Sequence, residues 1–205
     1  MKTYVLIENY IPHNNPPIPS LAKIGPSFYM KPDSALLMNH KPFFLPAFAE
    51  DFCATVQLVV KIGRLGKCIS EKFAMRYYTE VTAGVSIVAN DLLKELQHSG
   101  LPWDVAVGFD GSAVIGEFKQ LVGEGLPKNG LKFRLDLNGE TLQQGDTSMM
   151  KQSVEATIAQ LSNTSMLKMG DLIYMGAPCE GIKLAIDNHI EAYLGQEKVL
   201  DFYVR

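Results

Sequence analysis

The stretch of residues 51–118 constrains the fold more than any other part of the chain. It opens with the apolar pattern CATVQLVVKIG and closes with DVAVGFDGSAVIGEF. Residues two apart on a strand face the same side of a sheet, so Cys53, Thr55 and Gln57 form one row. That row carries no charge. Its chemistry therefore limits the kind of functional site that this strand can support.

Composition points to one ordinary globular domain over residues 1–205. The chain is 47% hydrophobic, which is enough for a sizeable core, and its net charge is −3. No basic surplus indicates nucleic acid or an anionic membrane as a partner. The first apolar run ends at Glu8 and Asn9, too early for a signal peptide or a membrane span. We therefore expect a cytoplasmic protein that binds neither nucleic acid nor membrane.

The three cysteines are predicted to be reduced thiols. Cys53, Cys68 and Cys179 are odd in number and widely spaced, and no CxxC pair occurs. Free cysteines are usually small buried residues, and that role is expected for all three.

Strand patterns dominate the chain. We expect strands at residues 3–8, 28–30, 53–62, 81–88, 113–118, 131–138, 172–175, 189–194 and 199–204. Asn138-Gly139 is a strong hairpin signal, because both central residues must accept positive φ. No strand–helix alternation recurs. The sequence therefore predicts a mainly β fold with a few helices (α+β), with residues 1–50 as a strand and loop region and residues 51–205 as the core.

Helices are expected at three places. Ser70 can cap a helix whose Phe73 and Tyr77 face inward. Asn90 or Asp91 can cap a second helix, which stops before Gly100 and Pro102. A third helix at residues 151–161 has apolar residues on one face.

Generic catalytic motifs do not identify the function. The chain contains no GxGxxG, P-loop, GxSxG or HExxH pattern, and its four histidines have no ligand spacing. Ordinary surface or hydrogen-bonded roles are expected for those histidines.

Several short segments, in their order and spacing, carry a resemblance to a known family. They are NYIPH, FYMKPDSAL, ANDL, GFDGSAVIG, LNGETLQQGDTS and MGDLIYMGAP. This order resembles the catalytic C-terminal domain of the fumarylacetoacetate hydrolase family. The resemblance implies a mixed β-sandwich or β-roll that is usually a homodimer. It also implies hydrolysis of C–C bonds in small oxo-acids, or their decarboxylation, with Mg²⁺ or Mn²⁺.

The resemblance also locates the family's metal carboxylates, and this chain lacks all three. The E-x-E strand and the following Asp fall at Thr55, Gln57 and Ser86. Magnesium ions normally need carboxylates to offset their dehydration. Asp51 is no substitute, because four residues of strand separate it from Thr55 by about 13 Å. We therefore expect no metal ligand at these positions and no resident cofactor.

Other positions that the resemblance identifies have changed as well. His13 matches a histidine of the family, but Pro16 stands where its glutamate partner would be. Asn90 replaces an arginine that would clamp a carboxylate, and Val107 replaces a basic residue. The resemblance leaves six pocket or substrate-binding candidates: Asn9, Tyr10, Lys31, Asn90, Thr147 and Gly176.

Three functional hypotheses follow. The first is a pseudoenzyme that keeps the fold and binds a small neutral or weakly anionic molecule. The second is an active hydrolase or isomerase without metal, with His13 as a base or Cys53 as a nucleophile. The third is a structural or regulatory subunit that pairs with an intact relative.

Overall fold

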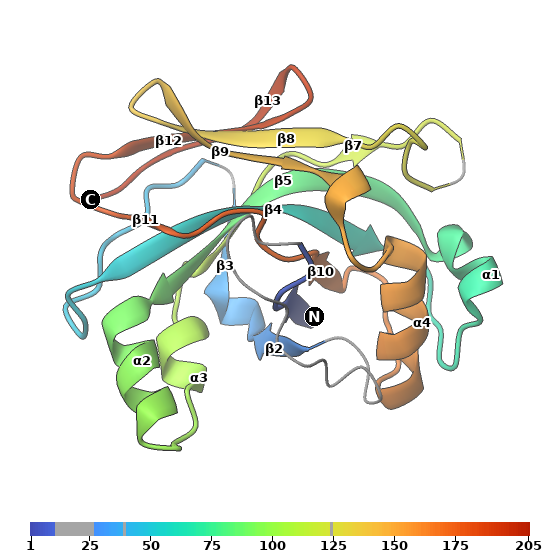
Figure 1. The fold of residues 1–205 in the computed structure, drawn as a ribbon, viewed down its shortest axis with the longest axis horizontal. Helices are drawn as coiled ribbons and strands as arrows, with labels where there is room; N and C mark the ends of the chain where they lie inside the picture. Colours follow the sequence, from blue (N-terminus) through green and yellow to red (C-terminus); the bar gives the residue numbers. More distant parts are fainter. Residues whose placement is uncertain (11–26, 39, 124) are drawn as a thin grey trace.

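A computed structural model describes residues 1–10, 27–38, 40–123 and 125–205. His13 and Pro16 lie outside these ranges, so the structure does not test the predictions made for them. Figure 1 shows two sheets stacked as layers, with helices at both ends of the lower one. The fold is the mainly β architecture that the sequence predicts.

The larger sheet is mixed and has the strand order β2-β1-β10-β4-β5-β6-β3, with β11 on β4 and β7 on β5. Its strands are β1 (Thr3–Leu6), β2 (Phe28–Lys31), β3 (Leu36–Leu37), β4 (Phe52–Ile62), β5 (Tyr78–Ala89), β6 (Ala113–Ile115), β7 (Lys119–Gln120), β10 (Leu172–Tyr174) and β11 (Ile182–Lys183). The long antiparallel pair β4–β5 forms its centre, and β1 runs parallel to β10. This pair carries the row that the sequence singles out.

The second sheet is antiparallel, with the order β13-β12-β8-β9. Its strands are β8 (Lys132–Leu137), β9 (Glu140–Asp146), β12 (His189–Leu194) and β13 (Glu197–Tyr203). Asn138 and Gly139 both have positive φ, which confirms the predicted hairpin turn. Figure 1 shows this sheet lying over β4 and β5.

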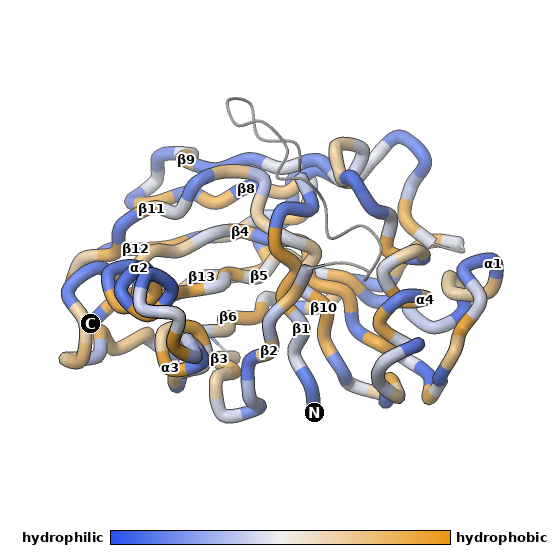
Figure 2. Tube along the Cα trace, turned by 60° about the horizontal axis from the view of Figure 1, so that its bottom comes forward, coloured by the Kyte–Doolittle hydropathy of each residue, from blue (hydrophilic) through white to orange (hydrophobic). Residues whose placement is uncertain are grey.

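The main core lies between the two sheets. Alternate β4 residues such as Val56 and Leu58 are fully buried and belong to one cluster with Phe133, Leu135 and other apolar residues of the second sheet. In Figure 2 the helices α2 and α3 lie together near one edge, and α1 and α4 lie at the other. Because side chains alternate along β4, the row of Cys53, Thr55 and Gln57 lies on the opposite face, away from the core between the sheets.

The helices differ in part from those predicted. They are α1 (Glu71–Ala74), α2 (Asn90–His98), α3 (Asp104–Val107) and α4 (Val154–Thr164), with 3-10 turns at Asp33–Ala35, Met75–Tyr77 and Thr147–Met149. The inward orientation predicted for Phe73 is wrong, because its ring is 44% exposed and Lys72 and Arg76 lie over it. Each helix within the described ranges is too short, or too polar, to span a lipid bilayer.

The burial expected for the cysteines is wrong. Cys68 and Cys179 are exposed and Cys53 is partly buried, and all three are free thiols. Cys68 has positive φ and Cys179 follows the end of β10, so both lie in connecting segments that pack at the surface.

Candidate functional site

Strand register brings together the three positions that the sequence analysis identified. Thr55 lies directly opposite Ser86, and Gln57 lies opposite Gly84, in the antiparallel β4–β5 pair. The Gln57 Nε2 donates to Thr55 Oγ1 at 3.2 Å, and Thr55 Oγ1 donates to the Ser86 carbonyl at 3.4 Å. The three residues therefore form one connected neutral group.

Gln57 also connects this group to the loop that follows β10, through a hydrogen bond with Gly176. Its Oε1 accepts a hydrogen bond from the Gly176 N–H at 3.0 Å, and the side chain is almost fully buried. Gly176 has a φ of 92°, and a Cβ there would lie 3.0 Å from the Asn9 Cβ. Both ends of the Gln57 amide are therefore used by the protein itself, at a loop position that favours glycine.

Asn9 fixes the far side of that loop. Its Nδ2 donates to the Met175 carbonyl at 3.0 Å and to the Gln152 carbonyl at 3.2 Å. Its Oδ1 accepts from the Gln152 N–H at 3.0 Å. With every amide group bonded to backbone, Asn9 acts as a clamp between two chain segments.

Ser86 has a partner that sequence reasoning missed. Its Oγ lies 3.2 Å from the Tyr29 hydroxyl, and the Trp103 ring meets the Tyr29 ring edge-on at 5.5 Å. Burial raises the pKa of Tyr29 to about 12, against the opposing effect of the Ser86 hydrogen bond. Strand periodicity could have predicted this partner. Tyr29 is two residues from the candidate Lys31 on β2, so both side chains lie on the same face of the sheet.

Lys31 is almost fully buried, next to the end of β5 and the segment before β6. Its Nζ donates to the Ile87 carbonyl at 2.8 Å and to the Ser112 carbonyl at 2.7 Å. Burial lowers the pKa of Lys31 well below its ordinary value. The two carbonyls accept two of the N–H donors of this amine. Lys31 therefore ties β2 to its neighbours, and its amine is directed to backbone carbonyls.

Asn90 is held at the end of the strand pair, away from this group. Its Nδ2 donates to Asp51 Oδ2 at 2.7 Å, and Lys183 lies 3.7 Å from Asp51 Oδ1. The Asn90 hydrogen bond is the main cause that lowers the pKa of Asp51. Neither residue has a hydrogen bond to Thr55, Gln57 or Ser86 within the described ranges.

Cys53 lacks the features of an activated nucleophile. Burial, and then the neighbouring Asp51 carboxylate, raise the pKa of its thiol. The thiol donates to Asp51 Oδ1 at 3.7 Å. Lys94 and Lys183 act in the opposite direction, but their effect on this pKa is smaller. A reactive cysteine needs surroundings in which the cationic effect prevails and stabilises the thiolate. The direction of this pKa shift disfavours Cys53 as a nucleophile.

Two other candidates lie under the second sheet. Thr147 Oγ1 accepts from the Leu131 N–H at 2.8 Å, which makes it a local structural residue. The Tyr10 ring packs edge-on against Phe133, and burial, followed by Asp146, raises its pKa. The described residues offer no hydrogen-bond partner for its buried hydroxyl. The site at β4–β5 therefore gathers Asn9, Gly176 and the three strand positions, but neither of these two residues.

Comparison with known proteins identifies the family. The family model for the fumarylacetoacetate (FAA) hydrolase C-terminal domain matches residues 4–202. The chain belongs to the fumarylacetoacetate hydrolase family. It is 32% identical over 169 residues to the mitochondrial oxaloacetate tautomerase FAHD1 of Rattus norvegicus, covering 82% of this chain and 75% of that protein. The mitochondrial oxaloacetate decarboxylase of Dictyostelium discoideum is 30% identical over 160 residues, covering 75% of this chain and 70% of that protein.

Solved structures confirm the fold of this family member. The fumarylpyruvate hydrolase of Pseudomonas aeruginosa, in complex with Mn²⁺ and pyruvate, superposes with a TM-score of 0.86 at 23% identity, covering 100% of this chain and 89% of that one. The 2-hydroxyhepta-2,4-diene-1,7-dioate isomerase of Mycobacterium marinum gives 0.81 at 25% identity, covering 99% and 73%. The resemblance stated from sequence is therefore confirmed.

The donor set at Thr55, Gln57 and Ser86 does not fit Mg²⁺ or Mn²⁺. It offers no charged oxygen, and Gln57 Oε1 is already an acceptor for Gly176. Within the described part of the chain, one group of three potential ligands occurs elsewhere, at His189, Glu191 and Asp201. There Lys198 already bonds both carboxylates, at 2.9 and 2.7 Å.

Proposed function

We propose that this chain is a fumarylacetoacetate hydrolase-family pseudoenzyme that lacks metal-dependent chemistry and binds a small molecule at the β4–β5 face. The observation that carries the proposal is the bonding of Gln57, whose amide joins Thr55 and Gly176 where a metal carboxylate would be. Relatives of the chain include oxaloacetate tautomerases and an oxaloacetate decarboxylase. The chemistry of those relatives does not transfer to this uncharged group.

The charge balance supports the loss of metal. A divalent cation that leaves water needs anionic oxygens to offset its dehydration. Here the three positions are neutral, and Asp51 is committed to Asn90 and Lys183. A metal at this face would be surrounded by hydroxyl and amide oxygens alone.

The polar groups at the face favour a neutral or weakly anionic ligand. Thr55, Ser86 and Tyr29 contribute hydroxyl groups, of which that of Ser86 is almost fully buried, and Trp103 packs edge-on with Tyr29. Lys31 is committed to two carbonyls, so no cation among these residues would pair with a dianionic oxo-acid. Hydroxyls and a ring suit hydrogen bonding and stacking with an uncharged molecule.

Titration calorimetry with MgCl₂ and MnCl₂ tests the proposal, together with turnover assays on oxaloacetate and fumarylpyruvate. We expect no binding in the micromolar range and no turnover above the uncatalysed rate. A Thr55→Glu, Gln57→Glu, Ser86→Asp triple variant restores the carboxylates and should gain Mn²⁺ binding. Micromolar binding with turnover by the natural chain would refute the proposal.

We also propose that the chain is a cytoplasmic homodimer, as the family resemblance suggests. Native mass spectrometry of the purified protein distinguishes this from the subunit hypothesis. A self-sufficient dimer supports the proposal, whereas co-purification with an intact relative favours a regulatory subunit. Cell fractionation tests the location.

A further inference from the structure

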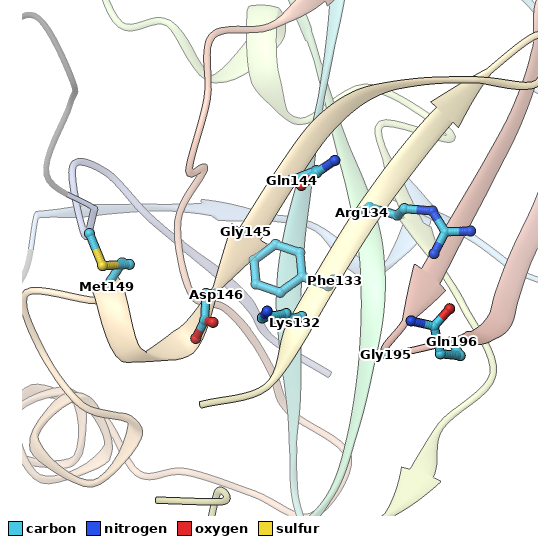
Figure 3. A pocket seen from close by; sticks show the side chains of 9 residues that line it. All are labelled: Lys132, Phe133, Arg134, Gln144, Gly145, Asp146, Met149, Gly195 and Gln196. Carbon is cyan, nitrogen blue, oxygen red and sulfur yellow. The ribbon is translucent and has the colours of Figure 1, made fainter. Parts of the chain in front are cut away.

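A cavity of about 420 Å³ lies at one end of the second sheet, where β8 begins, β9 ends and the β12–β13 hairpin turns. Figure 3 shows Arg134 and Gln196 on one side of it and Asp146 and Met149 on the other. Its volume is within the usual range for small-molecule sites. None of its lining residues belongs to the β4–β5 group.

Strand register places the polar residues of the cavity on one face. Lys132 lies opposite Asp146, and Arg134 lies opposite Gln144. Since side chains alternate along a strand, these four share a face while Phe133 between them points into the core. The outer face of β8–β9 therefore carries two cations, Lys132 and Arg134, beside an amide and two carboxylates, Asp136 and Asp146.

Arg134 is held in place before any ligand arrives. Its Nε donates to Asp136 Oδ1 at 3.2 Å and Oδ2 at 3.3 Å, and its Cζ lies 3.7 Å from the centre of the Tyr193 ring. Asp136 is in turn fixed by the Thr141 hydroxyl at 2.6 Å. One edge and one face of the guanidinium are thus fixed.

The other edge of Arg134 is available for recognition. In the residues that the structure describes, the two Nη groups make no hydrogen bond to protein, and Arg134 lines the cavity. A planar fork with one edge fixed is suited to bidentate contact with an oxyanion. Pre-organisation of this kind lowers the entropy lost on binding.

Lys132 adds a second positive charge beside Arg134. It lines the same cavity and lies opposite Asp146 in the strand pair, although no ion pair within 4.0 Å joins these two among the described residues. Asp146 accepts from the Ser148 N–H at 2.9 Å and from its hydroxyl at 2.7 Å, both at Oδ1. These bonds, and then the charge of Lys132, lower the pKa of Asp146. The Gln144 and Gln196 amides supply neutral donors nearby.

We propose that this cavity binds a small organic anion through a carboxylate or phosphate group. Arg134 would hold two oxygens with its Nη groups, and Lys132 would contribute a second charge. The remainder of the ligand would lie toward Gln196 and the Met149 side of the cavity. This site shares no residue with the proposed β4–β5 site, so the two proposals can fail independently.

The test uses the full chain and NMR titrations at constant ionic strength. Inorganic phosphate and acetate are added in separate series, with sodium chloride as the reference, while the Arg134 Nε–H signal is followed. We expect saturable shifts with at least one of the two anions. The series that saturates identifies the ligand group as phosphate or carboxylate.

Matched variants make the result specific. Arg134→Lys and Lys132→Gln should each weaken the apparent Kd at least tenfold, whereas the exposed controls Arg64→Lys and Lys72→Gln should leave it unchanged. If Arg134→Lys fails to fold, Lys132→Gln and Gln196→Ala provide the same comparison. Linear shifts equal to those in chloride, or an unchanged Kd in the cavity variants, would overturn the proposal.

Discussion

Gln57 shows how one amide can replace a charged site by bonding the surrounding protein. Its carbonyl receives the Gly176 N–H, and its NH₂ group reaches Thr55. Buried polar groups are expensive to leave without partners, so each of these bonds matters more for stability than its net strength indicates.

Replacement of Gln57 by Leu tests this role. The Gly176 N–H would lose its acceptor inside the protein, and we expect the free energy of unfolding to fall by about 1–3 kcal/mol. Urea denaturation measures the change. Gln97→Leu on the exposed side of α2 is the matched control and should change stability by about 0.5 kcal/mol or less. Equal effects for both variants would contradict the account.

Lys31 predicts a pH dependence with a defined sign. Its pKa is lowered by burial, so between that pKa and about 10.4 the unfolded chain binds a proton that the folded chain does not. The free energy of unfolding therefore rises with pH through this window. Below the window the folded chain must also protonate the buried amine, and that gain in stability is absent.

A Lys31→Met variant isolates this effect, because methionine binds no proton. In urea denaturation at pH 7, 8 and 9, the natural chain should gain stability relative to the variant within the window. The limit is about 1.4 kcal/mol per pH unit. A difference that stays constant with pH would show that Lys31 keeps its ordinary charge state.

The three thiols offer an internal comparison of reactivity. Cys53 is partly buried beside Asp51 with a raised pKa, whereas Cys68 and Cys179 are exposed. With iodoacetamide at neutral pH, peptide mass mapping should show Cys53 alkylated at least tenfold more slowly, because less thiolate is present. Labelling of Cys53 as fast as the other two would restore the nucleophile hypothesis.

At the scale of elements, the β4–β5 pair needs a residue without a side chain at Gly84, because residues of the neighbouring strands lie close to it. A Cβ on Gly84 would lie 2.6 Å from Val59 Cγ2 and 2.8 Å from the Val114 carbonyl. The second contact is with backbone, so the neighbours cannot simply turn away.

Gly84→Ala should therefore destabilise the protein by about 1–3 kcal/mol or more through overpacking. Gly63→Ala is the control, since its nearest contact would be the Tyr77 carbonyl at 3.8 Å. Thermal unfolding followed by circular dichroism compares the two variants. Similar melting temperatures would show that the strand pair can open to accept a methyl group.

The sequence predicts most of the strands and three of the four helices that the structure describes. Period-two patterns predict β4, β5 and three strands of the second sheet, β8, β12 and β13, and a buried apolar face predicts α4. The strand β9 is not predicted, because ETLQQGD is mostly polar. The single turn α3 (Asp104–Val107) was missed, because DVAV has no helical period over so short a length. Phe73 was misplaced because α1 has only four residues.

At the scale of the whole molecule, packing decides which candidate residues meet. Register brought Thr55 and Ser86 together, which a period of two can predict. Asn90, Thr147 and Tyr10 lie elsewhere because long-range contacts position them. Gln143, which was also missed, donates to the Ala54 carbonyl at 3.2 Å and joins β9 to β4. No local pattern reveals such a contact.

The central claim concerns the metal, and diffraction at the manganese absorption edge from crystals grown in MnCl₂ tests it most directly. The account predicts no anomalous peak within coordinating distance, about 2–2.5 Å, of Thr55 Oγ1, Gln57 Oε1 or Ser86 Oγ. The same crystals of the carboxylate-restored triple variant should show one. A six-coordinate manganese ion bound to these atoms in the natural chain would contradict the account.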